Sequence, residues 1–403
     1  MSSSMNKKKT AVIYYSRFTT APGGSEYLPI LFISALQKKG FFVTLALNMN
    51  IVDNLKQVLE MYNMQINLQM VNILSIRPEN AIIQKMDTIL PFYRTLQLKK
   101  LAKTADICIS TANMFDFGKP ANHVVYRMAR FGDEAFIDYS LHRKPLSGFP
   151  LFKRKMRTFL AEAFLRPLLR VRSTRKILAD QREHIYVPSQ YVADLMRAFY
   201  GPFNCTVFYP PTIFEVSPMK IPRDPMRIIY LGRIEPEKKI IQLIEIAECA
   251  RKLSGMSLEF HIAGYLLKTP YVRKIKNYVL DKPWIKLIGP VYGKDKTEFL
   301  LGGTYAIHAE RDEAFGICVT EYLKAGCIPI VPDEGGTPEV VANPALTYHT
   351  DEDAANILVR LLTDGAFRQE QLCFCKKRAE MFSFERYMEN QNRILNSILE
   401  RSE

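Results

Sequence analysis

The 403-residue sequence contains no apolar run approaching the roughly 20 residues that a membrane-spanning helix needs. Its first residues, Met1-Ser-Ser-Ser-Met-Asn-Lys-Lys-Lys, also lack the apolar core of a secretory signal. The seven cysteines are scattered and show neither a CxxC pair nor the Cys/His spacing of a zinc site. These absences argue against a spanning protein and a disulfide framework, and they predict a protein of the reducing cytoplasm.

Acidic residues are also in short supply, with 41 against 55 lysines and arginines, which leaves a formal net charge of +14. Nucleic acid, anionic lipid or a phosphorylated substrate would each suit such a charge. The sequence has no recognition motif, aromatic platform or zinc knuckle of a nucleic-acid-binding protein. We therefore expect no nucleic-acid partner.

Much of the basic excess lies within residues 150–176. Between Lys153 and Lys176 the only acidic residue is Glu162, and the basic residues are interleaved with phenylalanine, leucine and methionine. This mixture predicts an amphipathic surface that lies on an anionic membrane, with the protein peripheral on the cytosolic face. The alternative is a solvated helix that packs on its own domain through its apolar side.

Strands and helices alternate along two halves of the chain, which predicts an α/β protein with two Rossmann-like domains. The first half opens with a strand at Thr10–Tyr15, a helix from about Ser25 to Lys39 and a strand at 41–46. Further strands are expected at 107–110, 124–128, 185–187, 227–231, 258–263, 285–288, 305–309 and 328–331, and a helix at about 317–325. The predicted domains are 8–206, completed by a C-terminal helix within 384–403, and 226–383, with the proline-rich segment 207–225 as linker.

The first chemical pattern is Gly232-Arg-Ile-Glu-Pro-Glu-Lys238, directly after the expected strand 227–231. A turn from strand to helix at the carboxyl edge of a parallel sheet is where such folds bind ligands. Arg233 offers a forked cation and Lys238 a compact one, a pair that suits a diphosphate. An ordinary surface turn is the alternative.

The second pattern is Glu313-Ala-Phe-Gly-Ile-Cys-Val-Thr-Glu321, in which seven residues separate two glutamates. The backbone N–H groups of Phe315, Gly316 and Ile317 would form a helix N-terminus, which is a natural anion site. Carboxylates beside such a site suit neutral hydroxyl groups, with a sugar for Glu313 and a ribose for Glu321. The alternative is a helix-capping acid and an unrelated surface glutamate.

The third pattern is Gly23-Gly24 in the loop after the first strand, where glycine permits close approach of a phosphate or a sugar. It is neither a GxGxxG fingerprint nor a Walker loop. Taken alone, the pair indicates only a tight turn.

In this order and at these distances, the three patterns resemble family 4 of the retaining glycosyltransferases, which have the GT-B fold. The resemblance covers nearly the whole chain and is strongest over 228–341. Further matches there are Ile262-Ala-Gly264, Ile307-His308, Ala325-Gly326 and Glu334-Gly-Gly-Thr-Pro-Glu339. Within the family, Val207-Phe-Tyr-Pro-Pro-Thr212 and Ala306-Ile-His308 are similar to the enzymes that add mannose to lipid-linked oligosaccharides.

This resemblance implies two Rossmann-like domains that face each other across a cleft, with the last helix crossing back to the first domain. It implies that Arg233 and Lys238 hold the donor diphosphate as catalytic cations and that Glu313 contacts the transferred sugar. Glu321 would contact the ribose. The remaining implied donor contacts are Gly23, Gly24, Phe315, Gly316 and Ile317.

By the same resemblance, we expect transfer of a hexose from GDP-mannose or a UDP-sugar, with retention at the anomeric carbon. The acceptor would be a lipid-linked glycan at a membrane, and neither a metal ion nor a cofactor would be needed because the two cations take the metal's place. A non-catalytic binding subunit and a sugar-nucleotide epimerase of the same fold are the alternatives.

Two positions depart from the family pattern. Lys239 stands where a glycine usually follows the diphosphate lysine. The family often has a histidine near the reacting sugar, and the register here gives Arg127 on the acceptor side, with His123 four residues earlier. We therefore assign no general base.

Overall fold

The computed structural model describes residues 9–19, 26–49, 52–86, 89–111, 114–125, 152, 156–157, 159–214 and 221–400. The chain divides into two compact units. Unit 1 consists of residues 1–208 and 390–403, and unit 2 consists of residues 209–389. The divisions therefore fall between Phe208 and Tyr209, inside the segment expected to be a linker, and within the last helix.

Unit 1 is built on a parallel sheet in which seven strands are described, in the order β3-β2-β1-β4-β5-β6-β7. The side chains of β1 and β4 are almost entirely buried, because helices cover both faces of a parallel sheet. The strand order reverses between β1 and β4, which is where a doubly wound sheet opens a crevice. The strands are β1 Thr10–Tyr15, β2 Phe42–Leu47, β3 Val71–Ser75, β4 Ile107–Ser110, β5 Asn122–Val124, β6 His184–Val187 and β7 Thr206–Val207.

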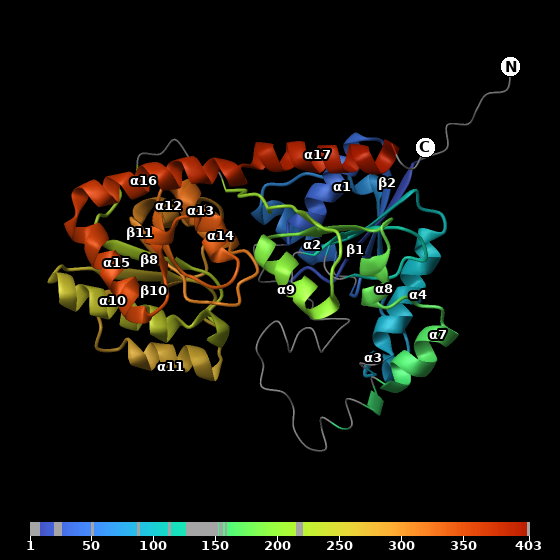
Figure 1. Ribbon diagram of the computed structural model, residues 1–403, viewed down its shortest axis with the longest axis horizontal. Helices are drawn as coiled ribbons and strands as arrows, with labels where there is room; N and C mark the ends of the chain where they lie inside the picture. Colours follow the sequence, from blue (N-terminus) through green and yellow to red (C-terminus); the bar gives the residue numbers. More distant parts are fainter. Residues whose placement is uncertain are drawn as a thin grey trace. The chain divides into compact units, whose positions relative to one another are not determined.

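Helices connect these strands, as Figure 1 shows. The side chain of Ser189 caps α9 by accepting a hydrogen bond from the N–H of Val192, as the Pro188-Ser189 pair indicates. The helices of unit 1 are α1 Leu28–Lys38, α2 Val52–Met61, α3 Ala81–Gln84, α4 Leu90–Ala102, a π-helical turn Ala161–Leu165, α7 Arg166–Leu168, α8 Thr174–Ala179 and α9 Gln190–Tyr200; α17, Phe384–Glu400, crosses from unit 2.

Unit 2 is built on a second parallel sheet, in the order β10-β9-β8-β11-β12-β13. This order reverses between β8 and β11, so the loops after these two strands lie next to each other at the carboxyl edge. The strands are β8 Arg227–Leu231, β9 Glu259–Ala263, β10 Ile285–Gly289, β11 Tyr305–Ile307, β12 Ile328–Pro332 and β13 Thr347–Tyr348.

The helices of unit 2 pack on this sheet through apolar residues spaced three or four apart. Helix α10 buries Ile240, Leu243, Ile244 and Ala247 in this way. The helices are α10 Ile240–Ser254, α11 Pro270–Tyr278, α12 Gly293–Gly302, α13 Ile317–Ala325, α14 Thr337–Val341, α15 Asp351–Thr363 and α16 Gly365–Ala379, with short 3₁₀ turns at Pro236–Lys238 and Glu380–Phe382.

Most expected elements lie within one or two residues of those observed, and the strands at Thr10–Tyr15 and Arg227–Leu231 are confirmed. Two differ more. The expected strand 124–128 is observed as β5, Asn122–Val124, and the rest of that range is outside the described residues. The expected helix from Ser25 begins at Leu28, because Pro29 favours the first turn of a helix.

The basic segment 150–176 has an inner and an outer side. Ala161, Leu165 and Leu169 pack against Phe92 of α4. Arg172 points inward and pairs with Asp116, Asp180 and Glu183 at 2.9, 3.0 and 2.7 Å. Among its described residues, the outer side exposes six large apolar side chains, those of Phe152, Met156, Phe159, Leu160, Phe164 and Leu168. The segment therefore packs on its own domain and also presents apolar groups to solvent, and its binding to a membrane stays a prediction.

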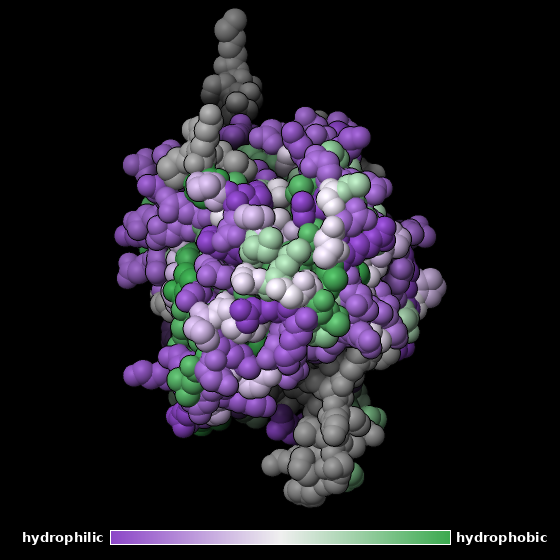
Figure 2. Space-filling view, turned by 90° about the vertical axis from the view of Figure 1, so that its left-hand side faces the viewer, coloured by the Kyte–Doolittle hydropathy of each residue, from purple (hydrophilic) through white to green (hydrophobic). Residues whose placement is uncertain are grey.

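No described helix is both long and apolar enough to cross a bilayer. The face seen in Figure 2 is mainly hydrophilic, and its apolar residues form small separate patches.

Candidate functional site in unit 2

The loop after β8 comes close to the backbone of the neighbouring strand. A Cβ atom at Gly264 would lie 2.0 Å from the carbonyl oxygen of Gly232, so a side chain at Gly264 would collide with the backbone. The hydroxyl of Tyr230 donates a hydrogen bond to the carbonyl of Arg233 at 3.1 Å. These contacts fix the start of the turn that carries Lys238.

Lys238 ends the 3₁₀ turn Pro236–Lys238, immediately before α10. The next residue, Lys239, has φ +50 and is left-handed, a conformation that glycine adopts without strain and lysine adopts at some cost. The geometry therefore gives a physical reason for the glycine that the family usually places here.

The ammonium of Lys238 lies between two carboxylates. Its Nζ atom is 2.5 Å from Oε2 of Glu313 and also contacts Oε2 of Glu310. The side chain of Lys238 is 13% exposed, and those of Glu310 and Glu313 are 17% and 21% exposed. Sequence reasoning predicted Lys238 and Glu313 as site residues, and the structure brings them into direct contact.

Burial and charge shift the protonation of this group. Burial alone would lower the pKa of Lys238, but the Glu313 and Glu310 carboxylates outweigh it and hold that pKa well above its usual value. Burial, together with the neighbouring Glu313, raises the pKa of Glu310 to about 7. Burial would also raise the pKa of Glu313, but Lys238 overrides it and lowers that pKa to about 2. At neutral pH Glu313 is therefore ionised, and Glu310 is about half protonated.

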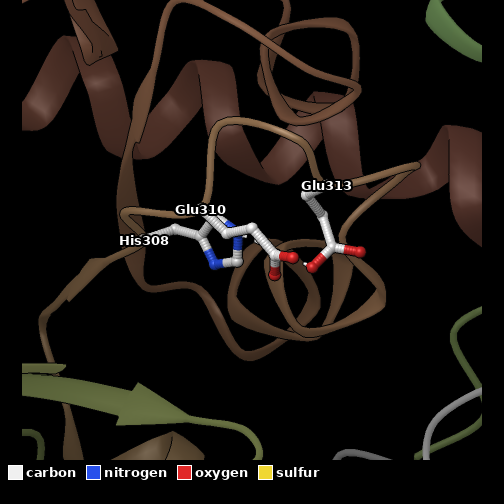
Figure 3. A group of neighbouring side chains, drawn as sticks. All are labelled: His308, Glu310 and Glu313. Carbon is white, nitrogen blue, oxygen red and sulfur yellow. Dashed lines mark ion pairs between the residues drawn. The ribbon is translucent and has the colours of Figure 1, made fainter. Parts of the chain in front are cut away.

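His308 follows β11 and lies beside the two glutamates, and its side chain is 1% exposed. Its Nε2 atom is 3.8 Å from Oε2 of Glu313, and Figure 3 shows the three side chains gathered together. Burial and the charge of Lys238 lower the pKa of His308 to about 4, so the imidazole is neutral at pH 7.

His308, Glu310 and Glu313 also have ligand atoms within 4.8 Å of one another, a spacing that a metal ion could use. However, the Lys238 ammonium already contacts both carboxylates. A divalent cation would compete with this ammonium for the same oxygen atoms. The geometry therefore fits an internal cation better than a bound metal.

The loop that carries Glu313 leads into α13 and is held by two glycines from the loop after β12. A Cβ atom at Gly335 would lie 2.4 Å from the carbonyl oxygen of Arg311, and one at Gly336 would lie 2.3 Å from that of Ala314. The N–H of Gly336 also donates to the carbonyl of Glu313 at 2.7 Å. The match at Glu334–Glu339 thus has a physical basis, because only glycine lets the two loops approach this closely.

The N-terminus of α13 is built as the sequence predicts. Gly316 is its N-cap, with φ +90, and a Cβ atom there would lie 2.7 Å from Cγ2 of Thr337. Phe315 is buried and stacks on Tyr209, with ring centroids 5.7 Å apart. Ile317 begins the helix, whose first backbone N–H groups have no partner within the helix. The turn can therefore receive an anion.

Glu321 lies in the second turn of α13 and makes a separate ion pair. Its side chain is 6% exposed, and its Oε1 atom is 2.6 Å from Nζ of Lys296 in α12. Sequence reasoning did not identify Lys296. The sequence shows only a lysine near the start of a helix. The structure shows that this helix, α12, packs beside α13.

Other expected residues either do not join the Lys238 group or fall outside the described part of the chain. Arg233 is 54% exposed and pairs with Glu235 at 2.6 Å, so it does not join the Lys238 group in this structure. Gly23, Gly24 and Arg127 are outside the described residues. His123 is fully buried in unit 1, where its Nε2 atom lies 3.0 Å from Glu183. His123 is thus part of a buried polar network, and that position offers no general base.

Residues 214–373 match the family model described as "Glycosyl transferases group 1". The chain is 25% identical over 182 residues to the phosphatidylinositol N-acetylglucosaminyltransferase GPI3 subunit of Saccharomyces cerevisiae, which covers 44% of this chain and 39% of the yeast protein. The gpi3 subunit of Schizosaccharomyces pombe is 24% identical over 190 residues, 46% of this chain and 41% of that protein. The chain thus spans about two fifths of the length of these relatives.

Solved structures resemble the whole chain in fold. HepE of Anabaena, in complex with UDP and glucose, has a TM-score of 0.63 at 14% identity, covering 96% of this chain and 100% of that one. WaaG, a glycosyltransferase involved in lipopolysaccharide biosynthesis, has a TM-score of 0.66 at 13% identity, covering 95% and 99%. The expected GT-B fold is confirmed, and residues 214–373 are similar to the glycosyl transferases group 1 family.

Proposed function

We propose that the protein is a glycosyltransferase that uses a nucleotide-diphosphate sugar and needs no metal ion. The observation that carries the proposal is the Lys238 ammonium, which is held between two carboxylates at the carboxyl edge of a parallel sheet. One of these carboxylates, Glu313, lies four residues before Ile317, the first residue of α13. A cation and a helix N-terminus are what a leaving diphosphate requires. Arg233 is a second cation, and its exposed side chain can turn toward a bound phosphate.

In this proposal each remaining group has one task. Glu313 accepts hydrogen bonds from the hydroxyls of the transferred sugar, and Glu321 accepts them from the ribose. The glycosyl bond breaks as charge develops on the diphosphate, which Lys238 and Arg233 stabilise. The acceptor attacks from the face that the diphosphate leaves, so the anomeric configuration is retained.

The donor and the acceptor are open to a direct test. The yeast relatives' name, phosphatidylinositol N-acetylglucosaminyltransferase, favours UDP-N-acetylglucosamine and a lipid acceptor over the GDP-mannose that the finer sequence similarity indicates. Both donors are therefore candidates, and mannosyl transfer stays a prediction.

A thermal-shift screen of the full chain against UDP, GDP, ADP and their sugar conjugates tests the donor. A ligand at about 100 times its Kd adds roughly 2.7 kcal/mol to the free energy of unfolding, which moves Tm measurably. Stabilisation by one nucleotide family that Lys238→Ala removes would support the proposal. A well-folded protein that no nucleotide stabilises would contradict it. A ligand-stabilised protein without turnover on lipid acceptors would favour a binding subunit, and a changed sugar in the recovered donor would favour an epimerase.

We further propose that the outer side of 152–168 binds an anionic membrane surface, which would bring a lipid-linked acceptor to the protein. Its six exposed apolar side chains lie on a segment rich in lysine and arginine, the combination that binds lipid interfaces. Arg172 contributes less than its charge suggests, because it pairs with buried carboxylates of unit 1. Arg166 also contributes less, because it pairs with Glu162 of the same segment.

Liposome flotation of the full chain tests this surface. We expect binding to vesicles that contain phosphatidylserine, weaker binding with added salt, and loss of binding in the double variant Phe159→Ser, Phe164→Ser. Leu280→Ser is the matched control, because Leu280 is 81% exposed but lies in unit 2. Equal binding by all three proteins, or none by the wild type, would contradict the proposal.

A further inference from the structure

Glu310 was not among the predicted site residues, yet it contacts the same ammonium as Glu313. It lies in the loop after β11, three residues before Glu313, and its Oε2 atom meets Nζ of Lys238. Figure 3 shows the carboxylates of Glu310 and Glu313 facing each other. One ammonium group thus serves two acids.

This arrangement conflicts with the binding of a diphosphate. With both acids ionised, the group formed by Lys238, Glu310 and Glu313 carries one net negative charge. A nucleotide sugar brings two more negative charges to the same place. Phosphate oxygens pair with Lys238 more strongly when one carboxylate leaves it or loses its charge, because the repulsion between the acids and the diphosphate then falls.

We propose that Glu310 is a positioning residue that holds the Lys238 ammonium while the donor site is empty, and releases it to the donor diphosphate as Glu310 takes up a proton from solvent. The inference rests on the proposed function. Glu313 remains ionised and keeps its contact with Lys238. The lysine therefore exchanges one partner, Glu310, for the diphosphate and stays beside Glu313 throughout.

The titratable groups around Glu310 decide whether it can take up this proton. Five titratable groups face it: Glu313 from its own loop, Lys238 from the turn before α10, His308 from the end of β11, Tyr230 from β8 and Cys318 from α13. His308, Tyr230 and Cys318 are neutral at pH 7, because burial lowers the pKa of the first and raises the pKa of the other two. The net charge of the group therefore depends on Lys238 and the two glutamates. Of the two acids, Glu310 takes the proton, because its pKa is about 7.

The consequence is a donor affinity that falls as the pH rises. Below pH 7 Glu310 is neutral and Lys238 is available to the diphosphate; above pH 7 the ionised Glu310 competes for it. Between pH 6 and pH 8 the Kd of the donor should rise about tenfold, because each pH unit above a pKa lowers the protonated fraction about tenfold. Both phosphates of a nucleotide sugar are esterified, so the charge of the ligand itself does not change over this range.

Isothermal titration of the full chain with UDP-N-acetylglucosamine and with GDP-mannose, at pH 6 and pH 8, tests the inference. We expect Glu310→Gln to bind the donor as tightly at pH 8 as at pH 6, and about tenfold more tightly than wild type at pH 8. The wild type at pH 8 should take up close to one proton per donor bound, seen as a binding enthalpy that changes with the ionisation enthalpy of the buffer. Glu248→Gln is the matched control, because Glu248 also pairs with lysines, Lys282 and Lys252, but lies on α10; it should keep the pH response of wild type.

The direction in which Glu310→Gln changes the donor affinity distinguishes this role from a structural one. If Glu310 only held its loop in place, Glu310→Gln would weaken binding at both pH values, and Glu310→Ala would weaken it further. Wild-type binding without proton uptake, or an unchanged pH response in Glu310→Gln, overturns the inference alone. No binding of either nucleotide sugar by the wild type at any pH overturns the proposed function as well.

Discussion

Nζ of Lys238 lies 2.5 Å from Oε2 of Glu313, although 75 residues separate them in the chain. Lys238 follows β8 and Glu313 follows β11, two strands that are neighbours in the sheet but not in sequence. The reversal of strand order at this point brings the two loops together. An ammonium group is thereby placed beside a turn that can receive an anion.

Removal of this cation should abolish most of the activity. We predict that Lys238→Ala lowers kcat/KM by about 10²-fold or more, because the charge developing on the diphosphate loses its compact cation. Steady-state rates with the donor found by thermal shift would measure the loss. Lys252→Ala is the control, since Lys252 is a 75% exposed lysine on the adjoining helix α10, and its rate should stay within about twofold of wild type. A folded Lys238→Ala variant that retains a tenth of the wild-type rate would contradict the assignment.

The sequence predicts the parts of this site that depend on local spacing. Glu313 and Glu321 are eight positions apart, and a glycine between them marks the start of a helix, so their places follow from helix geometry. The place of Lys238 follows from its position in the turn after the strand 227–231. Buried apolar strands and helices with a period near 3.6 likewise predict most of both sheets.

The missed features depend on packing between distant segments. The loop 310–313 contains three acids, and which of them turns inward depends on Gly335 and Gly336, more than twenty residues later. Arg172 belongs to the basic segment 150–176, which the sequence predicts to lie at a surface, but three carboxylates from other parts of unit 1 bind it. Such pairings require the tertiary fold, which charge patterns along the chain do not encode.

The close approach of the two loops predicts a steric effect. In Gly336→Ala the new methyl group would lie 2.3 Å from the carbonyl oxygen of Ala314, so the loop that carries Glu313 must move. We expect a loss of about 1–3 kcal/mol in the free energy of unfolding and at least a tenfold loss in kcat/KM. Gly365→Ala is the control, because the nearest atom to its added methyl group is 3.8 Å away. Wild-type rates in Gly336→Ala would show that the loop position does not matter.

The ion pair between Lys296 and Glu321 predicts a stability effect that depends on charge. Lys296→Met leaves the carboxylate of Glu321 almost fully buried without its cation, which should cost about 3–5 kcal/mol in chemical denaturation. Glu321→Gln in the same background should restore much of that stability, because the orphaned charge is then gone. Lys294→Met is the exposed control, at 71%, and should change stability by less than about 1 kcal/mol. Equal stability of the single and double Lys296 variants would contradict this account.

The neutral state of His308 predicts a loss of stability in acid. Its pKa in the folded protein is about 4, below the ordinary histidine value, because the ring is buried and faces Lys238. As the pH falls from about 6.5 toward 4, the unfolded chain binds a proton that the folded protein does not. The stabilisation that depends on His308 is thus fully present above pH 6.5 and falls by up to about 3 kcal/mol by pH 4.

His308→Gln should remove this contribution. Glu310 acts with the opposite sign over part of the same range, because its pKa is raised, so the informative quantity is the difference between variant and wild type. We expect the free energy of unfolding of His308→Gln, measured by urea denaturation from pH 7.5 to pH 4.5, to decline less in acid than that of wild type. His349→Gln, which removes a 74% exposed histidine, should follow the wild-type curve. Parallel curves for His308→Gln and wild type would mean that the imidazole is already charged in the folded protein, and the Lys238 group would then contain a second cation.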